Sequence, residues 1–190
     1  MATQTVPPPA RHLLSVHDFH RMGEAGILAG DDRVELIDGG LIDMAPIGSA
    51  HAGMVIRLSQ RLTRALAGRA IVSPQNPVRL DERSEPQPDI AVLRSRSDFY
   101  QESHPGPSDV LLVIEIADSS LDYDRDVKVP LYARHGVPEV WLVDLNARHV
   151  SVYRRPDGGA YREVLRPGGA ESLVPALLPD LSMSLADFWS

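Results

Sequence analysis

Three ionisable residues lie in or beside the most apolar segments of this sequence. Asp89 begins the apolar segment 89–93, Glu115 interrupts the continuous apolar run 110–117, and Lys128 follows in a segment with a helical pattern. Burying an isolated charge costs roughly several kcal/mol, so a charge in such a segment needs a partner, a metal ion or an exposed strand end. A conflict of this kind between local pattern and chemistry is typical of a functional site.

Two carboxylates on neighbouring strands can share a hard divalent cation. Magnesium prefers oxygen ligands, needs only one or two carboxylates and retains several waters. Such an ion activates water and stabilises charge on a phosphoryl oxygen, and a nearby lysine can orient the attacking water or neutralise charge at phosphorus. Asp89, Glu115 and Lys128 therefore suit phosphodiester hydrolysis. The spacing alone is weak support, because Asp124 and Lys128 also fit an ordinary ion pair four residues apart on a helix.

The segments that carry these residues predict alternating strands and helices. The run 110–117 is typical of a central strand covered on both faces. Strand alternation places Glu115 on the same face as Val113 and Ala117. Tyr123, Val127 and Leu131 recur every four residues, which predicts a helix from about residue 122. Pro130 should kink this helix or delay its start. Further strands are predicted at 70–72, 78–80, 89–93, 139–144, 150–153 and 161–165. The tail 173–188 is expected to pack back on the sheet. Together, the predicted strands and helices indicate an α/β fold with a mixed sheet and flanking helices.

The N-terminal part predicts a helix followed by a hairpin. Residues 1–12 are rich in proline and are expected to form a flexible arm. Ser15 and Asp18 match a capping box, which predicts a helix over 16–25. The segment 33–44 predicts a hairpin whose turn is the Gly-Gly pair at 39 and 40. A long amphipathic helix is predicted over 50–67, from the helical spacing of Met54, Leu58, Leu62 and Leu66.

Several further polar residues have more than one interpretation. Glu35 is either a solvent-facing strand residue or a carboxylate directed into a site. His51 and Arg57 are candidate substrate contacts, although His51 also suits capping or packing and Arg57 suits a solvated helix face. His17 and His20 are three residues apart on a helix, but no third ligand is near in sequence, so surface or packing roles are favoured over a metal pair.

Composition limits the classes of protein that need to be considered. The chain has 190 residues, which predicts one domain over 13–190, and its formal net charge of −7 argues against broad basic binding to nucleic acid. A local basic groove remains open, since 19 residues are Lys or Arg. The sequence has no cysteine, which excludes thiol chemistry and fits a reducing, cytoplasmic location. We expect no signal peptide and no membrane span.

Longer blocks of the sequence resemble the Uma-two family of restriction-endonuclease-like proteins, within the wider PD-(D/E)XK nuclease superfamily. The resemblance covers about residues 13–188. The matching blocks are 35–39, 44–51, 88–91, 114–117, 124–133 and 136–144. The last two are the most specific, and they include Pro130.

This resemblance implies a restriction endonuclease-like fold, a DNA substrate, a homodimer and dependence on Mg²⁺, with Mn²⁺ as a substitute. By the resemblance, Asp89 and Glu115 are metal ligands, Lys128 is the catalytic lysine, and Glu35 is a further acidic residue near the metal. The wider superfamily has a lysine two positions after the strand carboxylate, where this chain has Ala117. The predicted site therefore depends on Lys128 from the following helix.

The sequence leaves three functions to compare. The first is a magnesium-dependent DNA endonuclease. The second is a catalytically silent protein of nuclease fold that binds nucleic acid or protein as a regulatory module, which the acidic charge and the lack of a separate DNA-reading module support. In the third, Glu115 and Lys128 form only a structural ion pair.

Overall fold

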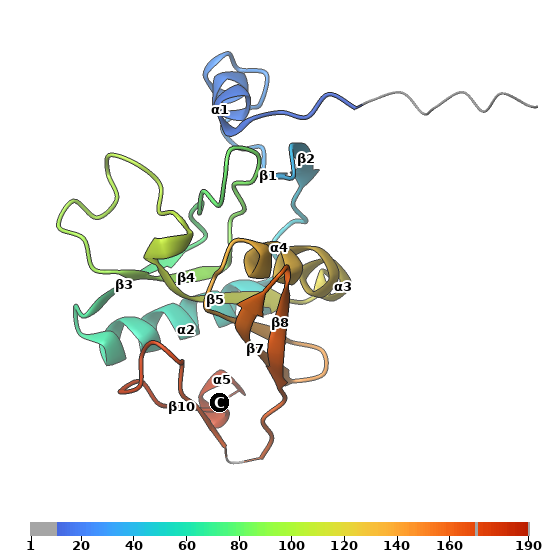
Figure 1. The fold of residues 1–190 in the computed structure, drawn as a ribbon. Helices are drawn as coiled ribbons and strands as arrows, with labels where there is room; N and C mark the ends of the chain where they lie inside the picture. Colours follow the sequence, from blue (N-terminus) through green and yellow to red (C-terminus); the bar gives the residue numbers. More distant parts are fainter. Residues whose placement is uncertain (1–10, 170, 190) are drawn as a thin grey trace, which may run out of the picture.

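The computed structural model describes residues 11–169 and 171–189, so most of the predicted arm, residues 1–10, lies outside the described part. A six-stranded mixed sheet forms the centre, in the order β3-β4-β5-β6-β7-β8 (Figure 1). Its strands are β3 Ala70–Pro74, β4 Ile90–Arg94, β5 Val110–Ala117, β6 Glu139–Asp144, β7 His149–Asp157 and β8 Ala160–Leu165. Neighbouring strands are antiparallel except for the parallel pair β5 and β6. The predicted α/β fold with a mixed sheet is confirmed.

Strand β5 is buried along its whole length because helices cover both faces of the sheet. Helices α2 (Ser49–Leu66) and α5 (Ala186–Trp189) cover one face. The core on this side includes Leu58, Leu62, Leu112, Ile114, Ile116, Trp141 and Phe188. The other face packs against α4 (Val129–Arg134), and its core includes Ala91, Val113, Ala117, Leu131, Tyr132 and Val140. Glu115 lies on this second face, as strand alternation predicts.

The turn that leads from β5 to α4 contains a π-helical segment. The chain passes from α3 (Leu121–Tyr123) through η2 (Asp124–Lys128) directly into α4. The backbone N–H of Val129 donates to the carbonyl of Asp124, five residues earlier. Pro130 has no N–H to donate and its ring clashes with a carbonyl four residues earlier in a regular α-helix. The wider π-turn accommodates this proline, where the sequence predicts a kink or a late helix start.

The N-terminal segment forms α1 (Val16–Glu24) and the hairpin of β1 (Val34–Ile37) and β2 (Gly40–Asp43). The predicted capping box is confirmed, since the Asp18 N–H donates to Ser15 Oγ at 3.1 Å and the Ser15 N–H donates to Asp18 Oδ2 at 3.0 Å. The hairpin turn lies one residue earlier than predicted. Asp38 and Gly39 occupy it with φ of 48° and 78°, because a two-residue turn with two positive φ angles accepts Asp-Gly well.

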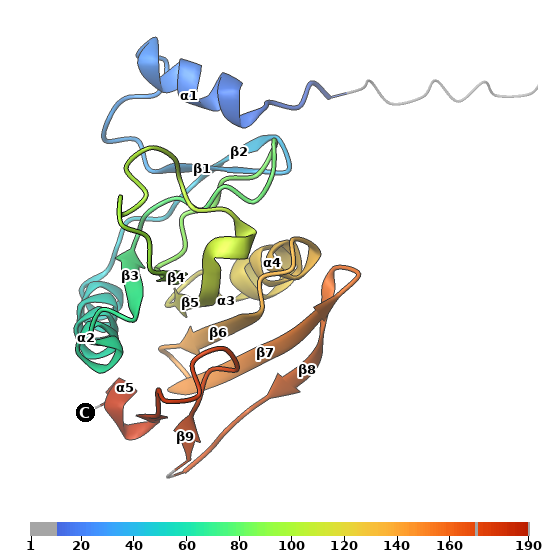
Figure 2. The same cartoon turned by 60° about the vertical axis from the view of Figure 1, so that its left-hand side comes forward.

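Two further details correct or complete the predicted strands. Residues 78–80 are not a strand, because their backbone N–H groups donate to loop carbonyls such as those of Ser84 and Pro86. The tail does pack back, through the small sheet of β9 (Ser172–Leu173) and β10 (Met183–Ser184) and through α5 (Figure 2). No helix among the described residues is long and apolar enough to cross a membrane. The single domain over 13–190 stays a prediction.

Candidate active site

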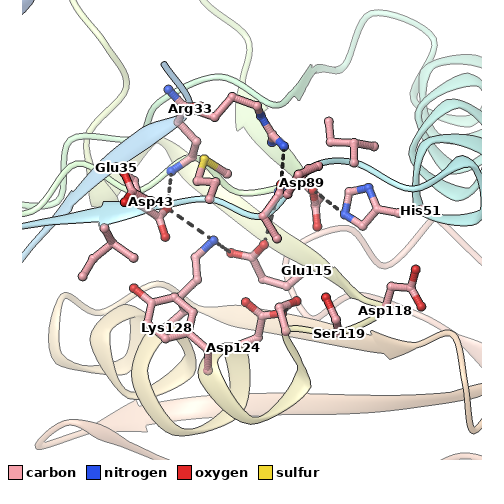
Figure 3. Close-up of a pocket in the computed structure, with 18 of the residues that line it drawn as sticks. Arg33, Glu35, Asp43, His51, Asp89, Glu115, Asp118, Ser119, Asp124 and Lys128 are labelled. Carbon is pink, nitrogen blue, oxygen red and sulfur yellow. Dashed lines mark hydrogen bonds and ion pairs between the residues drawn. The ribbon is translucent and has the colours of Figure 1, made fainter. Parts of the chain in front are cut away.

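A cavity of about 290 Å³ opens where the hairpin, the start of α2, the end of β5 and the π-turn meet. It contains five of the six candidate residues, among them the four expected at the metal site: Glu35, Asp89, Glu115 and Lys128 (Figure 3). The candidate substrate contact His51 also lines it. Other lining residues include Arg33, Asp43, Gly48, Gln87, Asp118, Ser119, Tyr123 and Asp124. Elements distant in the sequence therefore converge on one pocket.

Lys128 and Glu115 form a buried ion pair at the base of the pocket. Lys128 Nζ lies 2.8 Å from Glu115 Oε1 and 3.5 Å from Glu35 Oε2. The hydroxyl of Tyr132, one helical turn after Lys128, donates to the same Glu115 oxygen at 2.6 Å. Lys128 is 4% exposed, and both glutamates are 2% exposed. Lys128 therefore pairs with β1 and β5 rather than with Asp124, and the solvent-facing interpretation of Glu35 is wrong.

Asp89 connects β4 to the end of β5. Its Oδ2 accepts a hydrogen bond from the Ile116 N–H at 2.8 Å, and its own N–H donates to Glu115 Oε2 at 3.3 Å. His51 Nε2 lies 3.0 Å from Asp89 Oδ1. His51 stands in the first turn of α2, whose N-cap Gly48 makes no side-chain capping bond. The other ring nitrogen, Nδ1, is buried without a hydrogen-bond partner among the described residues, so His51 pairs with the carboxylate and does not cap the helix.

The burial of these groups changes their ionisation. Burial raises the pKa of the Glu115 carboxyl, and the neighbouring Lys128 ammonium opposes this rise. Burial lowers the pKa of Lys128, but Glu115, Tyr132 and Glu35 outweigh it, and the net pKa lies well above its usual value. Lys128 therefore stays charged at neutral pH. The hydrogen bond to Asp89 raises the pKa of His51, against the effect of burial.

Two residues of the pocket region were not predicted to belong to the site. Asp124 is 5% exposed, accepts a hydrogen bond from Ser120 Oγ at 2.6 Å, and has a pKa raised by burial. Tyr132 holds Glu115 from α4. One signal in the sequence was available: Lys128 is the single lysine of the chain, whose other 18 cationic side chains are arginines. Residues within one turn of that lysine were candidates for the same site.

Arg57, the sixth candidate residue, does not line this pocket. Its guanidinium donates to the backbone carbonyl of Phe188 at 3.3 Å. One turn further along α2, Arg61 Nη1 lies 2.5 Å from Asp187 Oδ1. These two arginines of α2 therefore bind the C-terminal helix. The position of Arg57 gives no support to a substrate contact at this site.

The donor set of the pocket suits a hard cation. Six carboxylates line it, against Arg33, Lys128 and His51. The carboxylates are those of Glu35, Asp43, Asp89, Glu115, Asp118 and Asp124. Magnesium needs only one or two carboxylates besides water. Glu115 Oε2 and both oxygens of Asp89 have one partner each, so each keeps a second lone pair for a cation, whereas Glu115 Oε1 already contacts Lys128 and Tyr132. Asp89 and Glu115, linked through the Asp89 N–H, fit that requirement.

The fold is shared with a solved structure. The solved structure of "a putative nuclease belonging to DUF820" from Anabaena variabilis ATCC 29413 superposes with a TM-score of 0.71 and 18% identity. The match covers 93% of this chain and 97% of that chain. Among curated proteins, none matches this chain.

A family model identifies the chain more narrowly. The model Uma2, described as "Putative restriction endonuclease", matches residues 16–186. The chain belongs to this family. The predicted resemblance is therefore confirmed.

Proposed function

We propose that this protein is a divalent-metal-dependent endonuclease that hydrolyses phosphodiester bonds of DNA. The observation that carries the proposal is the meeting of Asp89, Glu115 and Lys128 in one pocket, with Lys128 Nζ 2.8 Å from Glu115 Oε1. Strand β5 has Ala117 where the wider superfamily has its lysine. The π-turn supplies a lysine to the same carboxylate from another direction.

In this proposal Asp89 and Glu115 hold Mg²⁺, and Mn²⁺ can replace it. The bound ion would supply an activated water and charge stabilisation at the phosphoryl oxygen. The Ile116 N–H and the Tyr132 hydroxyl orient the two carboxylates from behind. Such hydrogen bonds fix a ligand in one orientation and tune its basicity.

Lys128 supplies the fixed positive charge of the site. Its ammonium is buried and stays charged, so it can stabilise the negative charge that develops on the phosphoryl group without a large reorganisation. Glu35 positions this ammonium, and its Oε2 also accepts the Gln87 N–H at 3.1 Å. His51 faces the pocket beside Asp89 and is the residue placed to contact the substrate.

The test is cleavage of supercoiled plasmid and of single-stranded DNA, with Mg²⁺, with Mn²⁺ and with chelator. We expect metal-dependent cleavage by the wild type and its loss in Asp89→Ala and in Lys128→Ala. Lys128→Arg keeps a positive charge but not the compact ammonium, so we expect reduced cleavage. Circular dichroism and thermal unfolding confirm that each variant is folded.

The matched control is Asp126→Ala, which removes an exposed carboxylate from the same π-turn that carries Lys128. We expect it to cleave as the wild type does. Unchanged cleavage by folded Asp89→Ala would overturn the assigned site. If the folded wild type binds DNA or protein but cleaves no substrate with either metal, the silent binding protein replaces the endonuclease.

Two further parts of the proposal concern the protein in the cell. We propose a homodimer, on the family resemblance, and a cytoplasmic location, which the absence of cysteine supports. Sedimentation equilibrium across a range of concentrations tests the first, and fractionation tests the second. A mass of one chain at all concentrations would exclude the dimer.

A further inference from the structure

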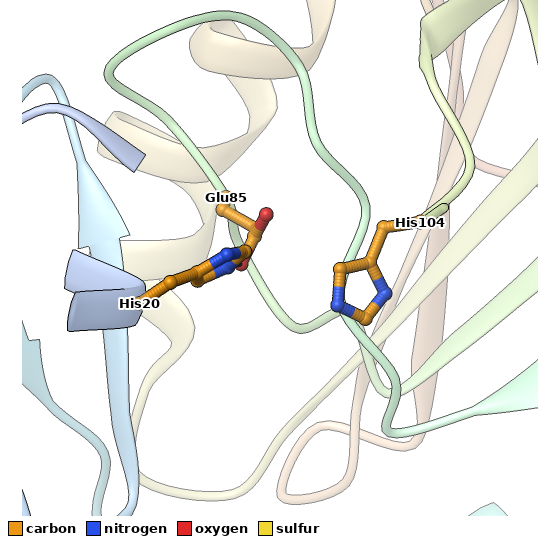
Figure 4. A group of neighbouring side chains, drawn as sticks. All are labelled: His20, Glu85 and His104. Carbon is orange, nitrogen blue, oxygen red and sulfur yellow. Dashed lines mark hydrogen bonds and ion pairs between the residues drawn. The ribbon is translucent and has the colours of Figure 1, made fainter. Parts of the chain in front are cut away.

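A second group of possible metal ligands lies outside the active-site pocket. His20, Glu85 and His104 bring one ligand atom each to within 4.8 Å of one another (Figure 4). His20 comes from α1, Glu85 from the segment between β3 and β4, and His104 from the segment between β4 and β5. From the sequence, His20 has only His17 as a nearby candidate ligand, because Glu85 and His104 are far away in the chain.

Glu85 is the unusual member of this group. It is 2% exposed, and its Oε1 lies 2.7 Å from His20 Nε2. Its other oxygen, Oε2, is buried and accepts no hydrogen bond from any residue that the structure describes. A buried carboxylate oxygen without a partner is costly, and such groups require an explanation. The backbone of Glu85 is held in place, since its N–H donates to the Leu36 carbonyl at 2.7 Å.

We propose that His20, Glu85 and His104 bind a zinc ion. Two imidazoles and one carboxylate are a common zinc ligand set, with a fourth position left for water. Imidazole ligands favour zinc and similar transition metals over magnesium, which prefers oxygen. The ion would provide the partner that Glu85 Oε2 otherwise lacks.

The observed spacing is close to what a zinc ion requires. Zinc lies about 2.0–2.2 Å from nitrogen and oxygen ligands, so tetrahedral ligand atoms are roughly 3.3 Å apart. Atoms within 4.8 Å of one another reach this spacing through small side-chain rotations. His20 and His104 are both exposed and free to make such rotations, whereas Glu85 is fixed by burial.

The proposed ion would clamp three segments of the chain together. It would tie α1 to the segment that runs from Glu85 to Asp89. Within that segment, Gln87 lines the active-site pocket and also the hollow beside His20 and His104. The Gln87 N–H binds Glu35. The ion would thus hold these segments together, whether or not the pocket cleaves DNA.

Zinc binding is measured on the metal-free full chain by titration against a chromophoric chelator and by thermal unfolding. We expect one high-affinity equivalent of Zn²⁺ and a higher Tm, because an ion that binds only the folded state stabilises it. Mg²⁺ should not compete at this site. Glu85→Gln and His104→Ala should each lower the affinity by more than the roughly 10- to 100-fold typical of losing an outer hydrogen-bond partner.

His17→Ala is the matched control, since it removes an exposed histidine from the same helix and should leave zinc binding unchanged. His104→Ala changes an exposed side chain, so it separates loss of metal from loss of folding. If zinc binding persists in Glu85→Gln and in His104→Ala, or if the wild type binds none, the proposal fails. Binding that is lost in Asp89→Ala instead would assign the ion to the active-site pocket and would also overturn it.

Discussion

At the scale of single residues, the buried lysine distinguishes this site from an ordinary ion pair. Surface salt bridges stabilise a protein by about 0–1 kcal/mol, whereas removing one partner of a buried pair costs about 3–5 kcal/mol. Lys128 faces Glu115 and Glu35, and Asp124 lies close enough to raise its pKa further. One buried cation thus faces several carboxylates, and burying this excess of negative charge lowers the stability of the fold. Such a cost is typical of a functional site.

Lys128→Met should therefore lower the free energy of unfolding by about 3–5 kcal/mol at neutral pH in metal-free buffer. Adding Glu115→Gln should recover part of this loss, because the amide is uncharged and its oxygen still accepts the Tyr132 hydroxyl. Urea unfolding of both single variants and the double variant measures the coupling.

The control is Arg125→Met in the same turn, whose ion pairs with Asp122 and Asp126 are exposed at the surface. Its change should stay within about 1 kcal/mol. A double variant no more stable than Lys128→Met alone would show that Glu115 is not what Lys128 compensates.

At the scale of elements, the π-turn decides where the lysine points. The segment η2 carries both Asp124 and Lys128, and both side chains are buried at the pocket. π-turns of this kind are frequent at functional sites. Pro130 opposes the regular α register at this point, because it offers no N–H and its ring needs room.

Pro130→Ala should reduce metal-dependent cleavage much more than it reduces stability. Alanine permits a regular α register, which would rotate the turn that carries Lys128. A displacement of about 1 Å at a catalytic group can lower the rate about 10²-fold. Cleavage rates and urea unfolding on the same preparation test this. Full activity in Pro130→Ala would mean that the ion pairs of Lys128, and not the proline, maintain the π-turn.

The cap of α1 predicts a pH dependence. Hydrogen bonds from the side chain and backbone of Ser15 hold the pKa of Asp18 below its usual 3.8. Because the folded-state pKa is the lower one, the stabilisation is present above about pH 3.8 and is lost as the pH falls through the folded-state value. The stability difference between wild type and Asp18→Ala should therefore be larger at pH 6 than at pH 3. A difference in urea midpoint that does not change between these pH values would contradict it.

At the scale of the whole molecule, the C-terminal tail completes the hydrophobic core. Phe188 is fully buried and lies 6.1 Å from Trp141, measured between ring centroids. Arg57 and Arg61 of α2 bind the same segment through Phe188 O and Asp187. The tail thus covers one face of the sheet, and the opposite face carries the carboxylates of the candidate site.

Phe188→Ala should lower the free energy of unfolding by about 3–5 kcal/mol, as is usual for a buried phenylalanine. Phe99→Ala is the matched control, since Phe99 is 70% exposed and its loss should change stability by no more than about 0.5 kcal/mol. Thermal and urea unfolding measure both. Equal effects of the two substitutions would mean that the tail does not form part of the core.

Local patterns were sufficient for much of the fold. The bounds of β5 and β6 agree with the predicted 110–117 and 139–144, because long apolar runs permit few other structures. The capping box of α1 was readable because its hydrogen bonds join residues only three apart. The hairpin turn was misplaced by one residue, since both Asp-Gly and Gly-Gly satisfy its backbone angles.

The sequence by itself determined the fold class and the residues of one carboxylate–lysine site, because apolar periodicity and family motifs are local in the chain. Only the tertiary structure decided where the side chains meet. It buries Glu35 beside Lys128, directs Tyr132 to Glu115, and brings Glu85 between two histidines. These contacts join residues that lie far apart in the sequence and on different helices, strands and loops. They depend on how strands and helices pack, and no local pattern records that packing.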